Sequence, residues 1–223
     1  MRWVTLQRDQ PLLPHDSGVG RPTMPTDMQL ATEIREKVRD AYSAASNTPT
    51  AEHPFPVGRA FAESLGYPSS LLDKLPADAV EAFAGVSNVS LFADIPMDAT
   101  VLDLGCGAGL DSLVASRRVG DAGKVLSVDF SEAMLERARQ SAEQIGAQNV
   151  SFEQGDAEHL HVASASVDVG LVNGIFNLNP AREAIFRELA RVIRPGGVVY
   201  AAELILAGTL PPQARQSDAD WFA

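Results

Sequence analysis

The fold is decided by residues 101–109, whose sequence is VLDLGCGAG. A short apolar run with one acid, Asp103, leads directly into three glycines at every second position. This pattern is typical of a buried strand whose backbone bends tightly beneath a ligand, because glycine adopts conformations that other residues avoid. A helix is expected to begin at about Leu110, and the free N–H groups of its first turn then point at the contents of the loop.

A second acid closes the next predicted strand. Residues 125–128 have the sequence VLSV, and Asp129 follows them, 24 positions after Gly105. An acid at this strand end is placed to accept hydrogen bonds from a ribose diol. Glycines between a strand and a helix also occur for packing alone, but the two acids favour a ligand site. The third glycine falls four residues after the first instead of five, which disfavours the G-x-G-x-x-G fingerprint of dehydrogenases.

These two segments resemble the first two motifs of class I S-adenosylmethionine-dependent methyltransferases. Three further segments resemble the third, fourth and fifth motifs in order, namely residues 149–158, 166–169 and 194–197. Finer features resemble the arsenite methyltransferase branch, namely residues 109–112, 173–180 and 202–205. The resemblance covers roughly residues 98–210 and implies a Rossmann-like fold, a methyltransferase activity and S-adenosylmethionine as the cofactor.

Strands and helices alternate after residue 98, which predicts an α/β fold with a doubly wound parallel sheet and right-handed crossovers. Ser131 is the expected N-cap of a helix that Gly146 closes. A later helix is expected to run to Pro195. Further strands are predicted at residues 150–154, 167–172 and 197–204. The inferred strand order is 3-2-1-4-5, which places the binding crevice between strands one and four.

Side chains at the carboxyl ends of the strands are the candidate cofactor-binding groups. We expect Asp103 to offer charge to the ammonium of the cofactor and Asp129 to bind its ribose hydroxyls. Asp156, with Ala157, is expected to reach the adenine amino group. Phe130 would lie against the adenine face, although an aromatic residue there equally fits a core. The loop is expected to bring its backbone close to the amino-acid half of the cofactor, through Gly105, Cys106, Gly107 and Gly109.

Three residues are the catalytic candidates. Asn173, beyond strand four, is expected to bridge cofactor and substrate. Glu203, near the end of strand five, is a candidate for contacting a cationic substrate or, equally, a hydrogen-bonded acid at a strand end. In the resembled family, a tyrosine near the position of Tyr42 lies in the N-terminal segment that covers the cofactor; simple packing is the alternative. Weaker candidates, for which solvent exposure or a charge at a helix start is the simpler interpretation, are His159, His161 and Asp111.

Cysteines bear on the nature of the methyl acceptor. The resembled arsenite methyltransferases hold trivalent arsenic with thiolates, one directly after the asparagine that matches Asn173 and one in a Gly-Cys-Gly-Asn sequence. This chain has Gly174 at the first position and the sequence GVSN, residues 85–88, at the second. Its single cysteine, Cys106, lies in the glycine loop, where a structural role is favoured. Thiolate capture of arsenic is therefore not supported, and no metal site is predicted.

Length and charge narrow the function further. The chain has 223 residues, enough for one full core with a small lobe beside it. A net charge of −11 disfavours a nucleic-acid substrate and fits a small neutral or cationic one. One cysteine excludes an intramolecular disulfide, and no segment resembles a secretory leader or a membrane span. We therefore expect a cytoplasmic protein with no membrane or nucleic-acid partner.

The N-terminal part is expected to have two segments. Residues 1–27 are rich in proline and glycine and predict a flexible tail; alternatively, they are an upstream extension of a gene that starts at Met24 or Met28. Apolar spacing predicts helices from Met28, over residues 59–65 and over residues 69–83. We interpret residues 28–97 as a helical lid against the cofactor face, and residues 98–223 as the Rossmann-like core.

The core ends early for its class. Class I methyltransferases usually add a helix and two strands after strand five, and the sequence after residue 204 predicts no such strands. The open edge is therefore expected to be covered by a second copy, as a homodimer, or by residues now missing. One hypothesis is an in-frame selenocysteine codon read as a stop soon after Trp221.

The combined prediction is an S-adenosylmethionine-dependent methyltransferase that acts on a small molecule and resembles arsenite methyltransferases without their cysteines. One alternative keeps the enzyme class but makes the acceptor an oxygen, nitrogen or carbon atom of a small metabolite. The other alternative is a truncated, inactive module that binds the cofactor.

Overall fold

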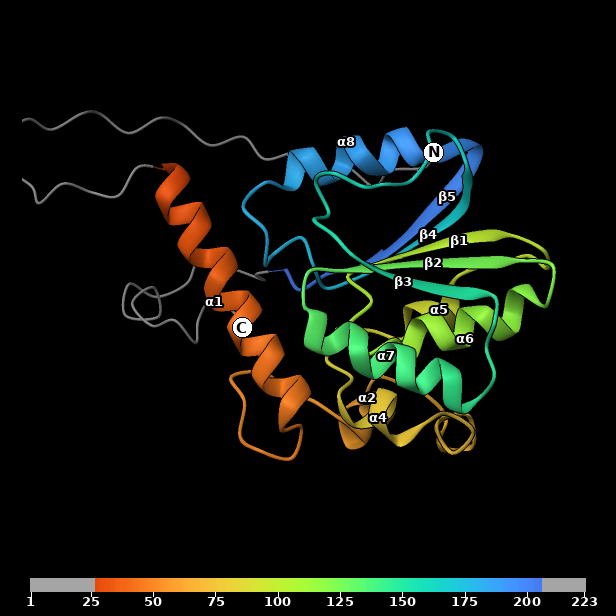
Figure 1. Ribbon diagram of the computed structural model, residues 1–223, viewed down its shortest axis with the longest axis horizontal. Helices are drawn as coiled ribbons and strands as arrows, with labels where there is room; N and C mark the ends of the chain where they lie inside the picture. Colours follow the sequence, from red (N-terminus) through yellow and green to blue (C-terminus); the bar gives the residue numbers. More distant parts are fainter. Residues whose placement is uncertain (1–26, 206–223) are drawn as a thin grey trace, which may run out of the picture.

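The computed structural model describes residues 27–205, in which a five-stranded parallel sheet carries helices on both faces (Figure 1). The strand order is β3-β2-β1-β4-β5. This confirms the predicted Rossmann-like α/β fold and the predicted order. The strands are β1 Thr100–Leu104, β2 Lys124–Asp129, β3 Val150–Gln154, β4 Val167–Asn173 and β5 Ile193–Ala202.

The central strand β1 sets the register of the sheet. Leu104 pairs with Val128 of β2 on one side and with Val172 of β4 on the other. Residues 101–104 are all buried, as expected for a parallel strand covered on both faces. The carboxyl ends of β1, β2 and β4 consequently meet at one edge of the sheet, directly below the glycine loop.

Helices α6 Leu110–Val119 and α7 Glu132–Gln144 cover one face, and α8 Arg182–Val192 covers the other (Figure 1). The Ser131 hydroxyl accepts a hydrogen bond from Met134 N at 3.4 Å, which confirms the predicted N-cap. The predicted limits of α8 and β5 were wrong. The helix ends at Val192 instead of Pro195, and β5 spans residues 193–202 instead of 197–204, because Ile193 already pairs with Val167 as extended backbone.

Residues 27–97 contain five helices and no strand. These are α1 Asp27–Asn47, α2 Arg59–Ser64, α3 Ser69–Leu72, α4 Ala77–Glu81 and α5 Val89–Phe92. The single helix predicted over residues 69–83 was wrong, because Pro76 is extended and restarts the chain as the N-cap of α4. The short helix α5 was not predicted.

Helix α1 crosses the end of the sheet at which α7 begins (Figure 1). The hydroxyls of Ser43 and Ser131 share a hydrogen bond of 3.0 Å, and the Ser46 hydroxyl donates to Ala133 O at 2.9 Å. These contacts join α1 to the first turn of α7. A lid function for residues 28–97 stays a prediction.

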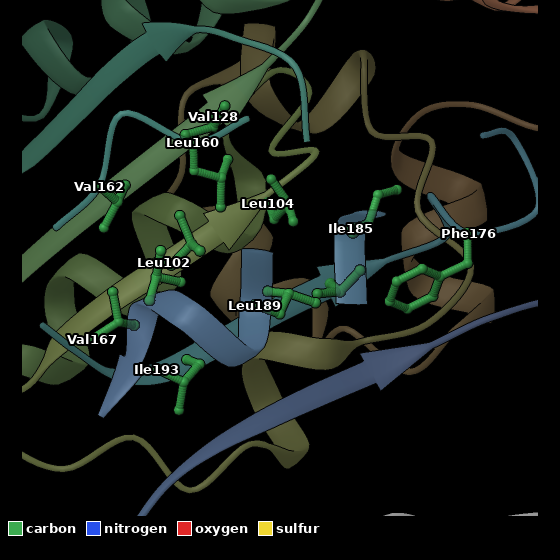
Figure 2. Close-up of a cluster of buried hydrophobic side chains, with 12 residues drawn as sticks. Leu102, Leu104, Val128, Leu160, Val162, Val167, Phe176, Ile185, Leu189 and Ile193 are labelled. Carbon is green, nitrogen blue, oxygen red and sulfur yellow. The ribbon is translucent and has the colours of Figure 1, made fainter. Parts of the chain in front are cut away.

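The core beneath α8 is built from apolar side chains of the sheet and of that helix (Figure 2). Leu102, Leu104, Ile185 and Leu189 are all at most 1% exposed. Burial of each such side chain contributes about 1.5–3 kcal/mol, and truncation of Leu189 to alanine would cost about 2–5 kcal/mol. This packing fixes the strands whose ends form the site.

Within residues 27–205, no helix has the length and apolar character needed to cross a membrane. In the same residues β5 pairs only with β4, so the covering of its outer edge by a second copy stays a prediction. The predicted tail, apart from Asp27, and the early ending with its selenocysteine hypothesis lie outside the described residues.

Candidate functional site

The glycine loop uses its three glycines for two different purposes. Gly105, Gly107 and Gly109 have φ angles of 74°, 52° and 86°. A Cβ atom at Gly105 would lie 2.3 Å from Ile175 Cγ2, and one at Gly109 would lie 3.0 Å from Ala138 Cβ. A Cβ atom at Gly107 would meet no atom within 4 Å. Packing therefore requires two of the glycines, whereas the third presents bare backbone to open space.

That open space is a pocket at the carboxyl ends of the strands, covered by α1 and by the segment after α4. It encloses about 1130 Å³, part of which is open to solvent. The predicted site residues that line it are Tyr42, Asp103, Gly105, Cys106, Gly107, Asp129, Phe130, Asp156, Ala157 and Asn173. Gly109, Glu203, His159 and His161 do not line it, but the weaker candidate Asp111 does.

Asp129 ties the glycine loop to β2. One carboxylate oxygen accepts a hydrogen bond from Gly107 N at 2.8 Å, and the other accepts one from Ser131 N at 2.8 Å. Burial raises the pKa of this carboxyl group, while the backbone donors act to lower it. A carboxylate has about four acceptor positions, and the backbone donors Gly107, Phe130 and Ser131 leave capacity for a hydroxyl in the pocket.

Asp103 is the most perturbed acid of the pocket. It is 2% exposed, and its Oδ2 accepts a hydrogen bond from the Ser112 hydroxyl at 2.5 Å. Burial, and next the negative charge of Asp111, raise the pKa of Asp103 to about 8. A cation that enters the pocket beside this carboxyl group would favour its ionised form.

Aromatic rings line the pocket below α1. Tyr42 stacks on Phe55 with 4.5 Å between ring centroids, and Phe130 meets Tyr42 edge-on at 6.5 Å. Burial, followed by the charges of Asp129 and Glu203, raises the pKa of Tyr42 well above its ordinary value. Tyr42 is therefore a neutral phenol, which is able to donate a hydrogen bond but is not a base at neutral pH. Asp156 is exposed at the rim beside Ala157.

Comparison with known proteins identifies the family. A family described as a methyltransferase domain matches residues 96–222. The chain belongs to the class I S-adenosylmethionine-dependent methyltransferases. An arsenite methyltransferase of Halobacterium salinarum is 36% identical over 153 residues, which are 69% of this chain and 39% of that protein. A demethylmenaquinone methyltransferase of Lactococcus lactis is 36% identical over 104 residues, which are 47% of this chain and 41% of that protein.

A solved structure supports the same branch of the family. An arsenic(III) S-adenosylmethionine methyltransferase from Chlamydomonas reinhardtii has a TM-score of 0.61 and 29% identity, over 70% of this chain and 56% of that chain. The chain therefore lies in the arsenite methyltransferase-like branch of this family, as its sequence motifs indicated. It spans less than half the length of the two curated relatives named above.

The two positions at which the methyltransferase lacks the expected cysteines lie against each other. A Cβ atom at Gly174 would lie 2.9 Å from Val86 Cγ1. Gly174 also has a φ of 83°, which side-chain-bearing residues rarely adopt. At Cys106, burial and then the charges of Asp129 and Asp103 raise the pKa of the thiol. Among residues 27–205, no group of three or more metal-ligating side chains is arranged to hold an ion.

Asn173 has no free hydrogen-bonding capacity. Its Oδ1 accepts from Val86 N at 2.9 Å and from Ser87 N at 3.1 Å, and its Nδ2 donates to Ser87 O at 2.7 Å and to Asp111 Oδ2 at 2.8 Å. An amide group makes four such bonds at most. The contacts favour a positioning role, in place of the predicted bridge between cofactor and substrate.

Glu203 is also committed to the fold. Its Oε2 accepts hydrogen bonds from Phe176 N at 2.6 Å and Asn177 N at 3.2 Å, and its Oε1 accepts from Leu204 N at 3.0 Å. The carboxylate therefore holds the turn after β4 and does not line the pocket. Of the two interpretations that the sequence left open, the geometry favours the hydrogen-bonded acid at a strand end.

Sequence reasoning missed one ion pair at the pocket rim. Arg35 Nη2 of α1 pairs with Glu158 Oε1, and Asn179 Nδ2 donates to the same oxygen at 3.0 Å. Glu158 follows the predicted adenine residues directly, so its position in the third motif was a usable signal. Nothing in the sequence pairs it with Arg35, which lies 123 positions earlier.

Proposed function

We propose that this chain transfers the methyl group of S-adenosylmethionine to a small-molecule acceptor. The observation that carries the proposal is the open backbone at Gly107, with the carboxyl groups of Asp103 and Asp129 on the same pocket. A charged amino-acid group and a ribose both require such partners. The pocket lies at the carboxyl ends of the parallel strands, which is where ligands bind in open α/β sheets.

The residues present fit the cofactor. Asp129 would accept hydrogen bonds from the ribose hydroxyls and Asp103 would pair with the ammonium. Phe130, Asp156 and Ala157 would hold the adenine. When bound, the cofactor supplies a methyl group activated by a positively charged sulfur. The protein aligns the acceptor in line with the breaking bond and excludes water. We assign the exclusion of water to α1, through its contacts with α7 and Glu158.

We propose an oxygen, nitrogen or carbon atom as the acceptor, not arsenic. Val86 and Gly174 occupy the two positions at which the resembled branch has thiolates, and the raised pKa of Cys106 keeps it a thiol. A trivalent arsenic centre requires soft, ionised sulfur ligands, and the residues that line this pocket supply none.

Methyl transfer is tested with radiolabelled S-adenosylmethionine and a panel of small acceptors that includes arsenite plus thiol. Label should move to one or more metabolites with nucleophilic oxygen, nitrogen or carbon, and arsenite should stay unlabelled. Labelled arsenite would contradict the proposed acceptor class. Binding of S-adenosylhomocysteine with no turnover across the panel would support the cofactor-binding module instead.

A further inference from the structure

Asp111, in the first turn of α6, joins three parts of the chain that are distant in sequence. Its Oδ1 accepts hydrogen bonds from the Tyr67 hydroxyl and from Ser90 N at 3.2 Å. Its Oδ2 accepts from Asn173 Nδ2 at 2.8 Å. Asp111 and Tyr67 are 5% and 2% exposed. A carboxylate buried to this extent is retained only with several donors, and here all three are present.

Asn173 extends this connection to the pocket wall. The amide that donates to Asp111 also holds both backbone N–H groups of Val86 and Ser87 and the carbonyl of Ser87. A Cβ atom at the neighbouring Gly85, which lines the pocket, would lie 2.5 Å from Asn173 Nδ2. The wall therefore depends on the orientation of the Asn173 amide group. The Asp111 carboxylate can only accept hydrogen bonds, so it requires the NH2 of Asn173, and not its oxygen, on the side that faces Asp111.

We infer that Asp111 is a positioning residue, whose buried carboxylate fixes Asn173 and, through it, residues 85–87 as the wall of the cofactor pocket. The inference rests on the proposed cofactor binding. It assigns Asn173 to the wall, and it assigns Asp111 a role beyond that of a charge at a helix start. Tyr67 serves as the matching donor from the segment between α2 and α3.

The charge of Asp111 affects the ionisation of its neighbours, which distinguishes this role from a purely structural one. Asp103 of β1 and Asp111 both line the pocket, and after burial the charge of Asp111 is the next cause that raises the pKa of Asp103, with a smaller contribution from Asp129 of β2. Tyr67 has a pKa raised by burial and by Asp111, so it remains a neutral donor. Arg118, also on α6, donates to Ser90 O at 2.6 Å and lies beside the same segment. Removal of the charge at position 111 therefore changes the ionisation of Asp103 as well as the hydrogen bonds.

The test is Asp111→Asn in the full chain, measured by S-adenosylhomocysteine titration across pH and by hydrogen exchange. The new amide has one acceptor and one donor in place of two acceptors, so its NH2 opposes the donor of either Ser90 N or Asn173 Nδ2, and we expect about 10- to 100-fold weaker binding. Exchange at the Val86 and Ser87 amides should accelerate. The pH midpoint of binding should move lower, by about one unit, because Asp103 loses a neighbouring charge. A merely structural loss would weaken binding without moving the midpoint.

An exchange of the two side chains supplies the matched rescue. Asn173→Asp alone sets two carboxylates against each other, and we expect it to weaken binding more than Asp111→Asn does. Asp111→Asn combined with Asn173→Asp restores a donor and an acceptor across the pair. A carboxylate at position 173 leaves Ser87 O without its donor, so recovery should be partial: the double variant should bind about 10-fold more tightly than Asn173→Asp alone, a non-additivity typical of residues in contact. Additive losses would overturn the inference.

Tyr67→Phe keeps the charge at Asp111 and removes one donor, so it tests the network even if Asp111→Asn fails to fold. We expect about 3- to 10-fold weaker binding with an unmoved pH midpoint. Unchanged affinity and unchanged amide protection in Tyr67→Phe would contradict its place in the network. If the original chain binds S-adenosylhomocysteine and Asp111→Asn binds it with the same affinity at every pH, the inference about Asp111 is contradicted and the proposed function is not. If the folded original chain does not bind, the proposed function fails.

Discussion

Two sides of the pocket are built in different ways. We call the side at Gly107 and Asp129 the cofactor end, and the side at Val86, Asn173 and Gly174, where the resembled branch has thiolates, the acceptor end. At the cofactor end, Gly107 and Asp129 lie on adjacent strand ends, and backbone atoms make most of the contacts. At the acceptor end, Asn173 holds Val86 and Ser87, which are 87 and 86 positions away, through side-chain atoms. The first arrangement follows from a short motif, whereas the second requires the fold. The difference teaches that in this chain the first arrangement can be read from a local motif, whereas the second depends on contacts between distant segments.

The largest expected effect breaks the cofactor end at Asp129. Asp129→Ala removes the acceptor for Gly107 N and for Ser131 N as well as the proposed ribose contact. We expect at least about 100-fold weaker binding of S-adenosylhomocysteine by calorimetry, since two or more hydrogen bonds to a charged group are lost. The matched control is Asp121→Ala, an exposed acid before β2, which should bind as the original chain does. Equal affinity in the two variants would contradict the proposed role of Asp129.

The next effect separates backbone strain from ligand contact. Gly107 and Gly146 both have positive φ, at 52° and 67°, and a Cβ atom at either meets nothing within 4 Å. Alanine at either position should cost about 1–2 kcal/mol of stability, measured by urea unfolding. Only Gly107→Ala should also weaken cofactor binding, by about 10-fold or more, because its methyl group enters the space for the cofactor. Similar binding by both variants would contradict the position assigned to the ligand.

The next prediction concerns the cofactor end at Asp103, whose ionisation makes the stability of the fold depend on pH. Its pKa is raised to about 8, so the folded chain holds a proton that the unfolded chain releases. The stability from this group is fully present below about pH 4 and is lost as pH rises towards 8. Asparagine cannot ionise, so Asp103→Asn keeps the stability that the original chain loses at this pH. Its melting temperature at pH about 8 should be higher, by about 2–4 °C for each kcal/mol of unfolding free energy retained. A variant that melts lower than the original at that pH would contradict the assigned ionisation.

The smallest expected effect lies at the acceptor end. Val86→Ala opens space beside Gly174 but leaves both hydrogen bonds from the backbone of residues 86 and 87 to Asn173. We expect a stability loss of about 1 kcal/mol by urea unfolding and S-adenosylhomocysteine affinity within about 3-fold of the original. A large loss of affinity would contradict the assignment of this wall to the backbone of residues 85–87, since only the side chain of Val86 is changed.

The sequence predicted the cofactor end well because its signals are local. The strand, the glycine loop and the acid at 129 lie within 29 residues, and parallel strands bring their ends together in any fold of this class. It predicted the limits of β5 poorly, because the pairing of Ile193 with Val167 depends on an irregular register. Short helices of four residues, such as α5, carry almost no periodic signal.

The roles of single polar side chains were harder to predict. Asn173 and Glu203 stand at strand ends, where ligand contact and loop anchoring use the same residue types. Only the partners distinguish the two roles, and those partners are Val86, Ser87 and Phe176, in other parts of the fold. Arg35 and Glu158 illustrate the same limit, since an ion pair across 123 positions leaves no trace in either local pattern.

The central claim is that the loop at Gly107 and the acids beside it bind the sulfonium nucleoside. Calorimetric titration of the full chain with S-adenosylhomocysteine, at pH about 7 in two buffers of different ionisation enthalpy, tests it most directly. We expect one ligand per chain and release of protons to the buffer, because Asp103 ionises when the ammonium arrives beside it. A folded chain that gives no binding heat in either buffer, and no thermal stabilisation by the ligand, would contradict the claim.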